Sequence, residues 1–390
     1  MRKYLGYLTI LLGAIIFLYV LYANSPYSQV TRPFSPYTLL TSSWERYKTS
    51  FIKADGRVVD YSQNGITTSE GQSYALLRAV WLDDKPEFDL VWNWTRNNLQ
   101  LSNGLFGWRW GQITPNRSGF LPGGGNNSAS DADTDIALAL IFAADRWGDK
   151  TYLVQAQRIL PGIWNEEVAT VAGQPVLTAG NWAKGSSLVI VNPSYFAPYA
   201  WRIFAKVDQA HSWNNLLAPA YNLLDRVGND SLGGKTAVGL PPDWVAVNMA
   251  DGALSVPPTA SLSTDYAFNA MRVPWRIALD YEWNKDSRAY QYLQNHFNFL
   301  AQTYSQTGKI LGTYHHDGTP ATTYESPAMY ATILPYFQLF HPNLGQKIYN
   351  GKIIQLYSTD RNSFNRNLPY YDQNWLWFGA AIYNHYLRPL

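Results

Sequence analysis

Apolar residues recur at i, i+3 and i+4 spacing in about a dozen segments of the chain beyond residue 38. This is the period of an amphipathic helix, so each segment is predicted to be a helix that buries one face. The segments are residues 39–52, 70–82, 86–99, 131–147, 152–164, 195–206, 212–227, 265–281, 287–303, 327–340, 344–357 and 372–386. Long stretches rich in Gly, Pro, Asn and Trp separate several of them. We therefore predict one all-α domain over residues 38–390, a toroid of helices whose loops build a groove at one end.

The first residues show a different pattern. Arg2 and Lys3 precede an apolar run over residues 4–23, interrupted only by two glycines and a threonine. At about 1.5 Å per residue this run can cross a hydrocarbon core of about 30 Å. We predict that residues 1–23 form a membrane anchor rather than a cleaved signal, because no small-residue cleavage site follows. The basic flank would stay in the cytoplasm and the remainder would be extracytoplasmic, or secreted or periplasmic if the segment were cleaved.

Residues 24–37 contain three prolines and are predicted to be a linker. They join the predicted anchor to the helical domain. The sequence therefore predicts three parts, which are an anchor over 1–23, a linker over 24–37 and the helical domain over 38–390.

The amino-acid composition limits the classes of function that the chain can have. The 390 residues include 16 Trp and 28 Tyr, and 15% are aromatic, which favours stacking on sugar rings over a core that merely exposes some aromatics. The net charge is +2 and the body of the chain has no basic run, which argues against a nucleic-acid partner. The absence of cysteine excludes disulfides and Cys-built metal sites. Residues 315–317 (HHD) lack the spacing of metal ligands. We expect neither a metal nor a cofactor.

Three carboxylates, Asp131, Asp133 and Asp135, alternate within five residues directly before an apolar helix. Like charges this close repel, so a fold retains them only where another interaction compensates. A saccharide site does so, because its carboxylates bind hydroxyl groups and help to keep a nearby acid protonated. The alternative is that the carboxylates complement a helix N-terminus, which we prefer for Asp135.

Residues 129–147 (ASDADTDIALALIFAADRW) fit the signature of glycoside hydrolase family 8 at every specified position. Further segments resemble the same family, namely 68–74 (TSEGQSY), 107–110 (GWRW), 192–195 (NPSY), 272–276 (RVPWR) and 370–372 (YYD). The resemblance extends from about residue 45 to the C-terminus. It implies an (α/α)6 barrel and an inverting endo-hydrolase of β-linked polysaccharides. Within the family the chain is most similar to the endoglucanases of bacterial cellulose synthesis.

The resemblance implies that Glu70 is the general acid and that Asp131 holds the distorted sugar beside it. Ser69 and Gln72 have capping-box spacing, which places Glu70 in the first turn of a helix, where the helix dipole favours its charged form. A catalytic acid needs the opposite shift, from burial and from anionic neighbours such as Asp131. The alternative role of Glu70 is only to complement the dipole.

Several side chains are expected to hold the substrate. Tyr195 and Arg272 match substrate contacts of the family, and the aromatic candidates, Trp182 among them, are as compatible with core packing as with stacking. Asp133 is either a substrate ligand or a supporting group. The predicted substrate-binding residues are Trp108, Trp110, Asp133, Tyr195, Asn269, Arg272 and Tyr371.

The residue at the position of the family's general base differs from the common pattern. Many family members have Asp three residues before the matched arginine, where this chain has Asn269. An amide can orient a water molecule but cannot take its proton. Asp265, one turn earlier on the same face of a predicted helix, is the first candidate, and its alternative role is to cap that helix. Glu325, Asp372 and Asp251 are further candidates.

These observations predict an inverting endo-β-1,4-glycanase that acts on cellulose or a related exopolysaccharide, with a polysaccharide synthase or export complex as a possible partner. Asn269 also motivates a different class, a catalytically silent sugar-binding subunit of an export system. A chitosanase or xylanase on the same fold is the third hypothesis. The acid and the sugar-binding residues do not distinguish these substrates, because the loops that form the subsites decide between them.

Overall fold

The computed structural model describes residues 35–365 and 367–390. The predicted anchor and nearly all of the predicted linker lie outside these residues. Within the described part of the chain, no helix is both long enough and apolar enough to span a bilayer. The linker prediction was wrong at its end, because α2 (Pro36–Phe51) begins at Pro36. Proline is favoured in the first helical turn, where its missing N–H is not needed, so this proline starts a helix.

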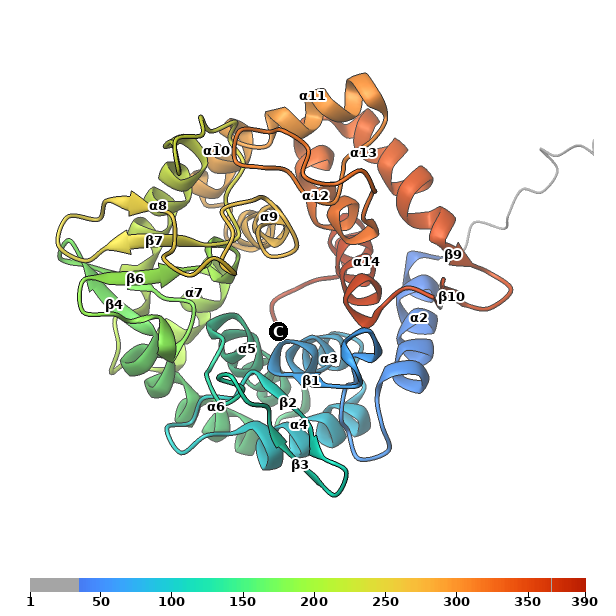
Figure 1. Cartoon of the computed structure of the whole chain (residues 1–390). Coiled ribbons are helices and arrows are strands. Elements are labelled where there is room, and N and C mark those ends of the chain that lie inside the picture. Colours follow the sequence, from blue (N-terminus) through green and yellow to red (C-terminus); the bar gives the residue numbers. More distant parts are fainter. Residues whose placement is uncertain (1–34, 366) are drawn as a thin grey trace, which may run out of the picture.

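An inner ring of helices forms the centre of the described structure (Figure 1). Each inner helix packs on the next, and the last packs on the first, which closes the ring. Nearly every side chain of several of these helices is buried, as expected for helices covered on all sides. In ring order they are α3 (Ser69–Trp81), α5 (Ser130–Trp147), α7 (Pro198–Val207), α9 (Val273–Asn284), α12 (Pro327–Phe340) and α14 (Tyr370–Tyr383).

Outer helices pack against this ring, mostly through one apolar face each. In α4 all buried residues except Trp94 follow the helical period on the side that packs on α3, namely Phe88, Val91, Trp92, Thr95 and Leu99. The outer helices are α2, α4 (Lys85–Leu99), α6 (Lys150–Gly162), α8 (Leu217–Asn229), α10 (Ser287–Asn295), α11 (Asn298–Thr307) and α13 (Pro342–Ile348). The predicted all-α toroid is confirmed in its main feature, and the two layers of helices fit an (α/α)6 barrel.

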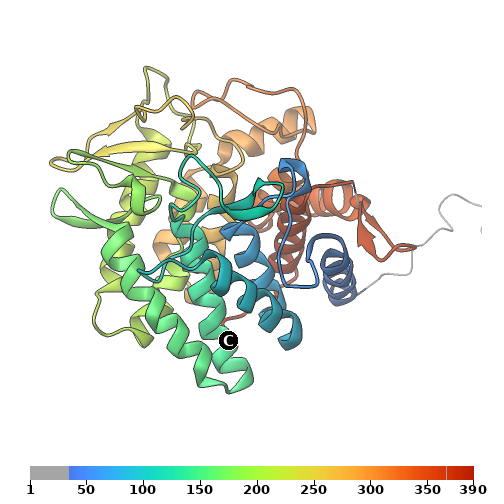
Figure 2. The ribbon, with the colours of Figure 1, turned by 60° about the horizontal axis from the view of Figure 1, so that its bottom comes forward.

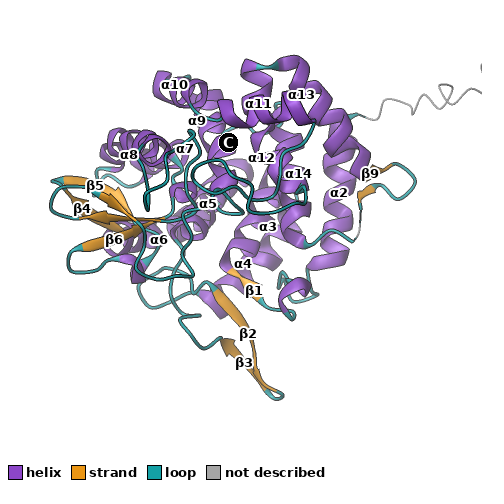
Figure 3. Cartoon of the chain, turned by 45° about the horizontal axis from the view of Figure 1, so that its top comes forward, coloured by secondary structure: helices purple, strands orange, loops and turns teal. Residues whose placement is uncertain are grey.

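Short antiparallel strands that the pattern did not predict lie at the periphery of the helices (Figure 3). They lie within or beside the long loops, which explains why helical periodicity gave no sign of them. The sheets are β1 (Thr67–Thr68) with β2 (Arg109–Thr114) and β3 (Arg117–Phe120), β4 (Val168–Val171) with β5 (Gln174–Leu177), β6 (Leu188–Val191) with β7 (Val245–Asn248) and β8 (Leu254–Ser255), and β9 (Tyr357–Ser358) with β10 (Ser363–Phe364).

Three predicted helices differ from the structure. The segment 265–281 becomes helical only at Ala270, because the Asp243 carboxylate accepts the backbone N–H groups of Ala267, Asn269 and Ala270 and holds a turn there. The segment 287–303 is divided between α10 and α11 at Phe297, whose φ is +65°. The segment 344–357 leaves the α-helical geometry after Ile348.

Candidate active site

Long loops gather at one end of the ring (Figure 2). A groove of about 950 Å³ lies at this end, beside the N-terminal ends of the inner helices. The first turns of α3, α5 and α14 reach it, as do residues directly before α7 and α9. Its carboxylates and larger aromatic rings are Asp60, Glu70, Asp131, Asp372, Trp108, Trp182, Tyr195, Trp244, Phe268, Tyr370 and Tyr371.

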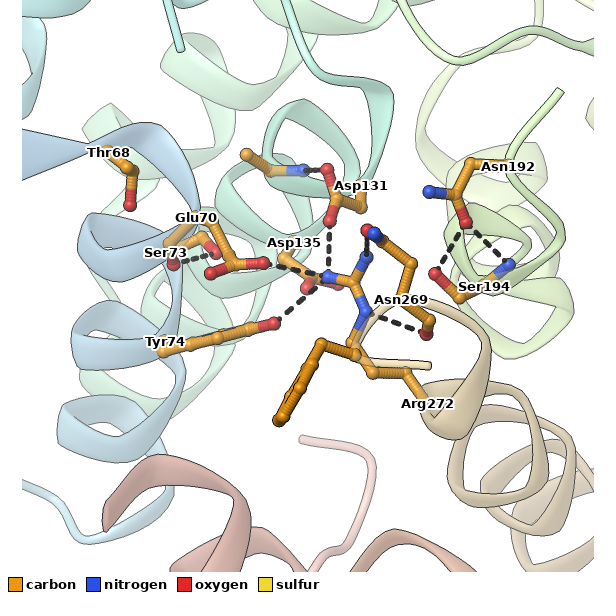
Figure 4. Close-up of polar contacts among 12 residues, drawn as sticks. Thr68, Glu70, Ser73, Tyr74, Asp131, Asp135, Asn192, Ser194, Asn269 and Arg272 are labelled. Carbon is orange, nitrogen blue, oxygen red and sulfur yellow. Dashed lines mark hydrogen bonds and ion pairs between the residues drawn. The ribbon is translucent and has the colours of Figure 1, made fainter. Parts of the chain in front are cut away.

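Arg272 joins the two principal carboxylates below the groove. Its Nη1 lies 2.9 Å from Glu70 Oε2 and 2.7 Å from Asp131 Oδ2, and its side chain is only 1% exposed. Its Nη2 donates to Asn269 Oδ1 at 2.8 Å, and Nη1 also lies 3.2 Å from the Tyr74 hydroxyl. Figure 4 shows these groups converging from three separate segments of the ring. The predicted acid and the predicted sugar-binding aspartate are therefore brought together at one guanidinium.

Glu70 lies in the first turn of α3, as expected, but the expected capping box is absent. Thr68 is the N-cap and accepts the Gly71 N–H at 3.0 Å, while the Gln72 side chain points inward to Val58 and Thr95. Sequence reasoning therefore placed Glu70 correctly with the wrong capping residue.

Burial dominates the protonation of Glu70. Its pKa is raised to about 7. Desolvation is the largest cause of this increase, the Asp131 charge adds to it, and the Arg272 charge opposes it. The Tyr370 hydroxyl donates to Glu70 Oε1 at 3.1 Å and favours the charged form. Tyr370 was not predicted as a Glu70 ligand. A Cβ at Gly71 would come within 3.2 Å of the Tyr370 ring, so this glycine admits the tyrosine.

The three alternating aspartates separate in the structure. Asp131 faces the groove, and its Oδ1 also accepts the Ala132 N–H at 2.9 Å. Asp135 was expected to complement the helix N-terminus, but it forms a buried bidentate pair with Arg276 at 2.9 and 2.7 Å. Asp133 does not line the groove. Its side chain is fully buried and accepts the Phe106 N–H at 2.8 Å, which corrects the prediction that it binds substrate.

The predicted aromatic residues do not all reach the groove. Trp108, Trp182, Tyr195 and Tyr371 line it, but Trp110 does not. Trp110 packs edge-on against Trp94 with ring centroids 5.1 Å apart, so it is a packing residue. Tyr195 is held by η4 (Pro193–Tyr195), which Asn192 caps through Ser194.

Trp244 lines the groove between Trp182 and Tyr195, and sequence reasoning missed it. It stands in a loop without periodicity. Its neighbour Asp243, also missed, holds the turn that carries Asn269, and burial raises the pKa of Asp243 to about 6.

The structure tests the placement of the candidate bases. Asp265 does not share a helix face with Asn269. It lies before the helix, outside the groove lining, and its Oδ1 is 2.8 Å from His315 Nδ1. Glu325 is bound by Lys352 and Tyr330, and Asp251 lines a different cavity. Of these four candidates only Asp372 lines the groove.

The described residues contain no group of three His, Asp or Glu side chains placed to hold a metal ion. The arrangement instead provides one carboxyl with a raised pKa, a second carboxylate beside it, and aromatic faces along an open groove. These are the components of acid-catalysed cleavage of a polymer of sugar rings.

Comparisons with known proteins agree with this geometry. Residues 17–359 match the glycosyl hydrolases family 8. An endoglucanase of Cellulomonas uda is 36% identical over 241 residues, which are 61% of this chain and 63% of the relative. Endoglucanase A of Acetivibrio thermocellus is 35% identical over 260 residues, which are 64% of this chain and 50% of the relative. The matched part thus spans between half and two-thirds of these two relatives.

A solved structure gives the same result for the fold. The crystal structure of a family 8 endoglucanase from Klebsiella pneumoniae is 26% identical, with a TM-score of 0.67. The alignment covers 88% of this chain and 99% of that one.

We expect the Asp131→Asn substitution to lower the pKa of Glu70 below about 7, because it removes a negative charge that raises this pKa. Carboxyl ¹³C NMR titration of glutamate-labelled protein measures the value, and Glu70→Gln identifies the resonance. Asp145→Asn, at an exposed position near the far end of α5, is the matched control and should leave the titration unchanged. An unaltered Glu70 titration in Asp131→Asn would contradict the electrostatic coupling.

Proposed function

The chain belongs to the glycosyl hydrolases of family 8, and from this premise we propose that it is an inverting endo-β-1,4-glucanase acting on cellulose or a related exopolysaccharide. The observation that carries the proposal is the pairing of Glu70 and Asp131 on one buried guanidinium at the floor of an aromatic groove. Similarity to proteins named endoglucanases supports the choice of substrate. A groove open to solvent suits cleavage within a long chain.

In this proposal Glu70 is the general acid. Its raised pKa keeps it protonated at mildly acidic pH, so it can give its proton to the glycosidic oxygen as the bond from that oxygen to the anomeric carbon breaks. Asp131 is held by Arg272 and binds hydroxyl groups of the sugar beside that bond. Trp108, Trp182 and Trp244 supply faces for the neighbouring rings.

An inverting enzyme also needs a base that takes a proton from water as the water oxygen bonds to the anomeric carbon. Two further carboxylates line the groove. Both oxygens of Asp60 accept hydrogen bonds from Ser62 or Gln63. Asp372 accepts one backbone N–H, from Ala328, and its pKa is raised by burial. We assign the base to Asp372 in place of Asp265.

Asn269 supports a second candidate function, a sugar-binding subunit without activity, because an amide replaces the common base. Hydrolysis by the purified protein separates the two functions. A protein that binds cello-oligosaccharides but releases no reducing ends from any β-glycan would be the silent subunit.

We expect the wild-type rate of reducing-end release from carboxymethylcellulose to fall as the pH rises through about 7, where Glu70 loses its proton.

We expect Glu70→Gln to lower this rate by about 100- to 10,000-fold, because the amide has no acidic proton to give. Viscosity should drop early in the reaction, as for cleavage within chains. Glu45→Gln, an exposed position on α2, is the control. Equal rates for Glu70→Gln and the control would discard the acid assignment.

We expect Asp372→Asn to reduce turnover by at least about 100-fold while cello-oligosaccharide affinity stays within a few-fold, because an amide cannot accept the proton of water. Asp265→Asn removes a carboxylate outside the groove lining and should leave turnover unchanged. Steady-state kinetics and binding by tryptophan fluorescence measure both effects. Full turnover in Asp372→Asn together with loss in Asp265→Asn would return the base to Asp265.

We propose further that the domain is extracytoplasmic, tethered by residues 1–23, and linked to the synthesis or secretion of a polysaccharide. The support is the apolar run with its basic flank and the expected substrate. The full chain should stay with membranes after an alkaline carbonate wash and be digested by protease added outside spheroplasts. A chain lacking residues 1–23 should be recovered in the soluble fraction. Full-length protein released by the wash would exclude the tether.

A further inference from the structure

Two buried carboxyl groups lie behind the groove and have no part in the chemistry above. Asp133 belongs to α5, and Glu167 ends the π-helical turn η2 (Ile163–Glu167) that follows α6. Both side chains are fully buried, and they come from two elements that pack on each other, so that the two carboxyl groups face each other across this contact. Asp133 Oδ2 and Glu167 Oε2 have no donor elsewhere in the described chain. Two ionised carboxylates cannot donate to each other, so one of them must carry a proton.

The surroundings of the pair explain why it keeps a proton. Desolvation raises the pKa of Glu167 to about 8 and that of Asp133 well above its ordinary value. The charged groups that act on the pair are Asp131, which raises both pKa values, and Lys184, which lowers that of Glu167. Asp133 uses its other oxygen for a backbone N–H, and Glu167 uses its other oxygen for a hydroxyl.

The pair connects three segments that carry groove residues. Asp133 Oδ1 accepts the Phe106 N–H at 2.8 Å, two residues before Trp108. Glu167 Oε1 accepts the Ser128 hydroxyl at 2.5 Å, three residues before Asp131. We call residues 106–108, 128–131 and 178–182 the three groove segments.

The third groove segment is attached through the second. The Ser128 N–H donates to Asn181 Oδ1 at 3.0 Å, and the Asn181 N–H donates to the Ser128 hydroxyl oxygen at 2.9 Å. The Glu167 carbonyl accepts the Thr178 N–H at 2.7 Å. Asn181 directly precedes Trp182, which lines the groove. Every groove segment is thus one or two hydrogen bonds from the carboxyl pair.

We propose that Asp133 and Glu167 share one proton and together hold the three groove segments in place as positioning residues. The inference rests on the proposed function only where sugar binding is measured. Loss of the shared proton leaves two buried negative charges side by side, which repel and separate the segments. The clamp is therefore intact below the folded-state pKa of the pair and weakens as the pH rises through it.

The stability that the pair contributes depends on pH. Because the folded protein keeps a proton that the unfolded carboxyls release near pH 4–5, the pair contributes stability that is complete below about pH 4 and is lost as the pH rises from there through the raised folded-state pKa of the pair. Asp133→Asn mimics the protonated aspartate, since its oxygen still accepts the Phe106 N–H and its amide donates to Glu167. This variant should not lose that stability.

The test compares Asp133→Asn, Glu167→Gln and Asp133→Ala with wild type. Melting temperatures are measured from pH 5 to 9, where groups such as Glu70 contribute equally to all four proteins and cancel in the differences. We expect the wild-type melting temperature to fall relative to both amide variants as the pH rises. Parallel curves for wild type and Asp133→Asn would overturn the shared proton, whether or not Asp133→Ala folds.

Positioning is measured separately, by cello-oligosaccharide affinity at pH 6 in the Glu70→Gln background. We expect Asp133→Ala to weaken binding by about tenfold, because displaced groove segments no longer present their rings together, and Asp133→Asn to stay within about twofold. Equal weakening by the alanine and asparagine variants would overturn the clamp. Failure of the Glu70→Gln parent to bind any oligosaccharide would refute the proposed function and leave the melting test of the pair intact.

Discussion

The site depends on the buried guanidinium of Arg272. Glu70 and Asp131 both contact its Nη1, so this single cation allows two carboxylates from adjacent helices to meet in a desolvated place. Such a group is costly to bury unless all of its partners are present. Desolvation still outweighs the cation at Glu70, whose pKa is raised rather than lowered. The same arrangement therefore holds the acid in position and keeps it protonated.

A second ion pair repeats the first one helical turn deeper. Asp135 follows Asp131 by four residues, and Arg276 follows Arg272 by four, so both pairs join α5 to the segment of η6 (Ala270–Arg272) and α9. The deeper pair is bidentate and also contacts the Tyr199 hydroxyl of α7. Because the two pairs share one spacing, the deeper pair sets the register at which Arg272 meets Asp131 and Glu70.

The helical period also explains the alternation of aspartates. Residues two apart on a helix face nearly opposite directions, whereas residues four apart share a face. Asp131 and Asp135 therefore face Arg272 and Arg276, while Asp133 faces Glu167 on the other side. The repulsion that the sequence implied is relieved by two cations on one face and by a shared proton on the other. The Asp133 and Glu167 pair extends this arrangement to the loops that carry the groove tryptophans.

The sequence by itself determined the helical class and most helix positions, because periodicity is a local property, and its motifs singled out Glu70 and Asp131, which the structure brings together on Arg272. It did not determine where the helix in the segment 265–281 starts, since Asp243, distant in sequence, holds a turn there by accepting backbone N–H groups. For the same reason it misplaced Asp265 and Trp110 and missed Trp244 and Tyr370. Which carboxylates meet, which are buried and which keep a proton depend on contacts between residues up to 300 positions apart. Only the closed ring of helices decides them.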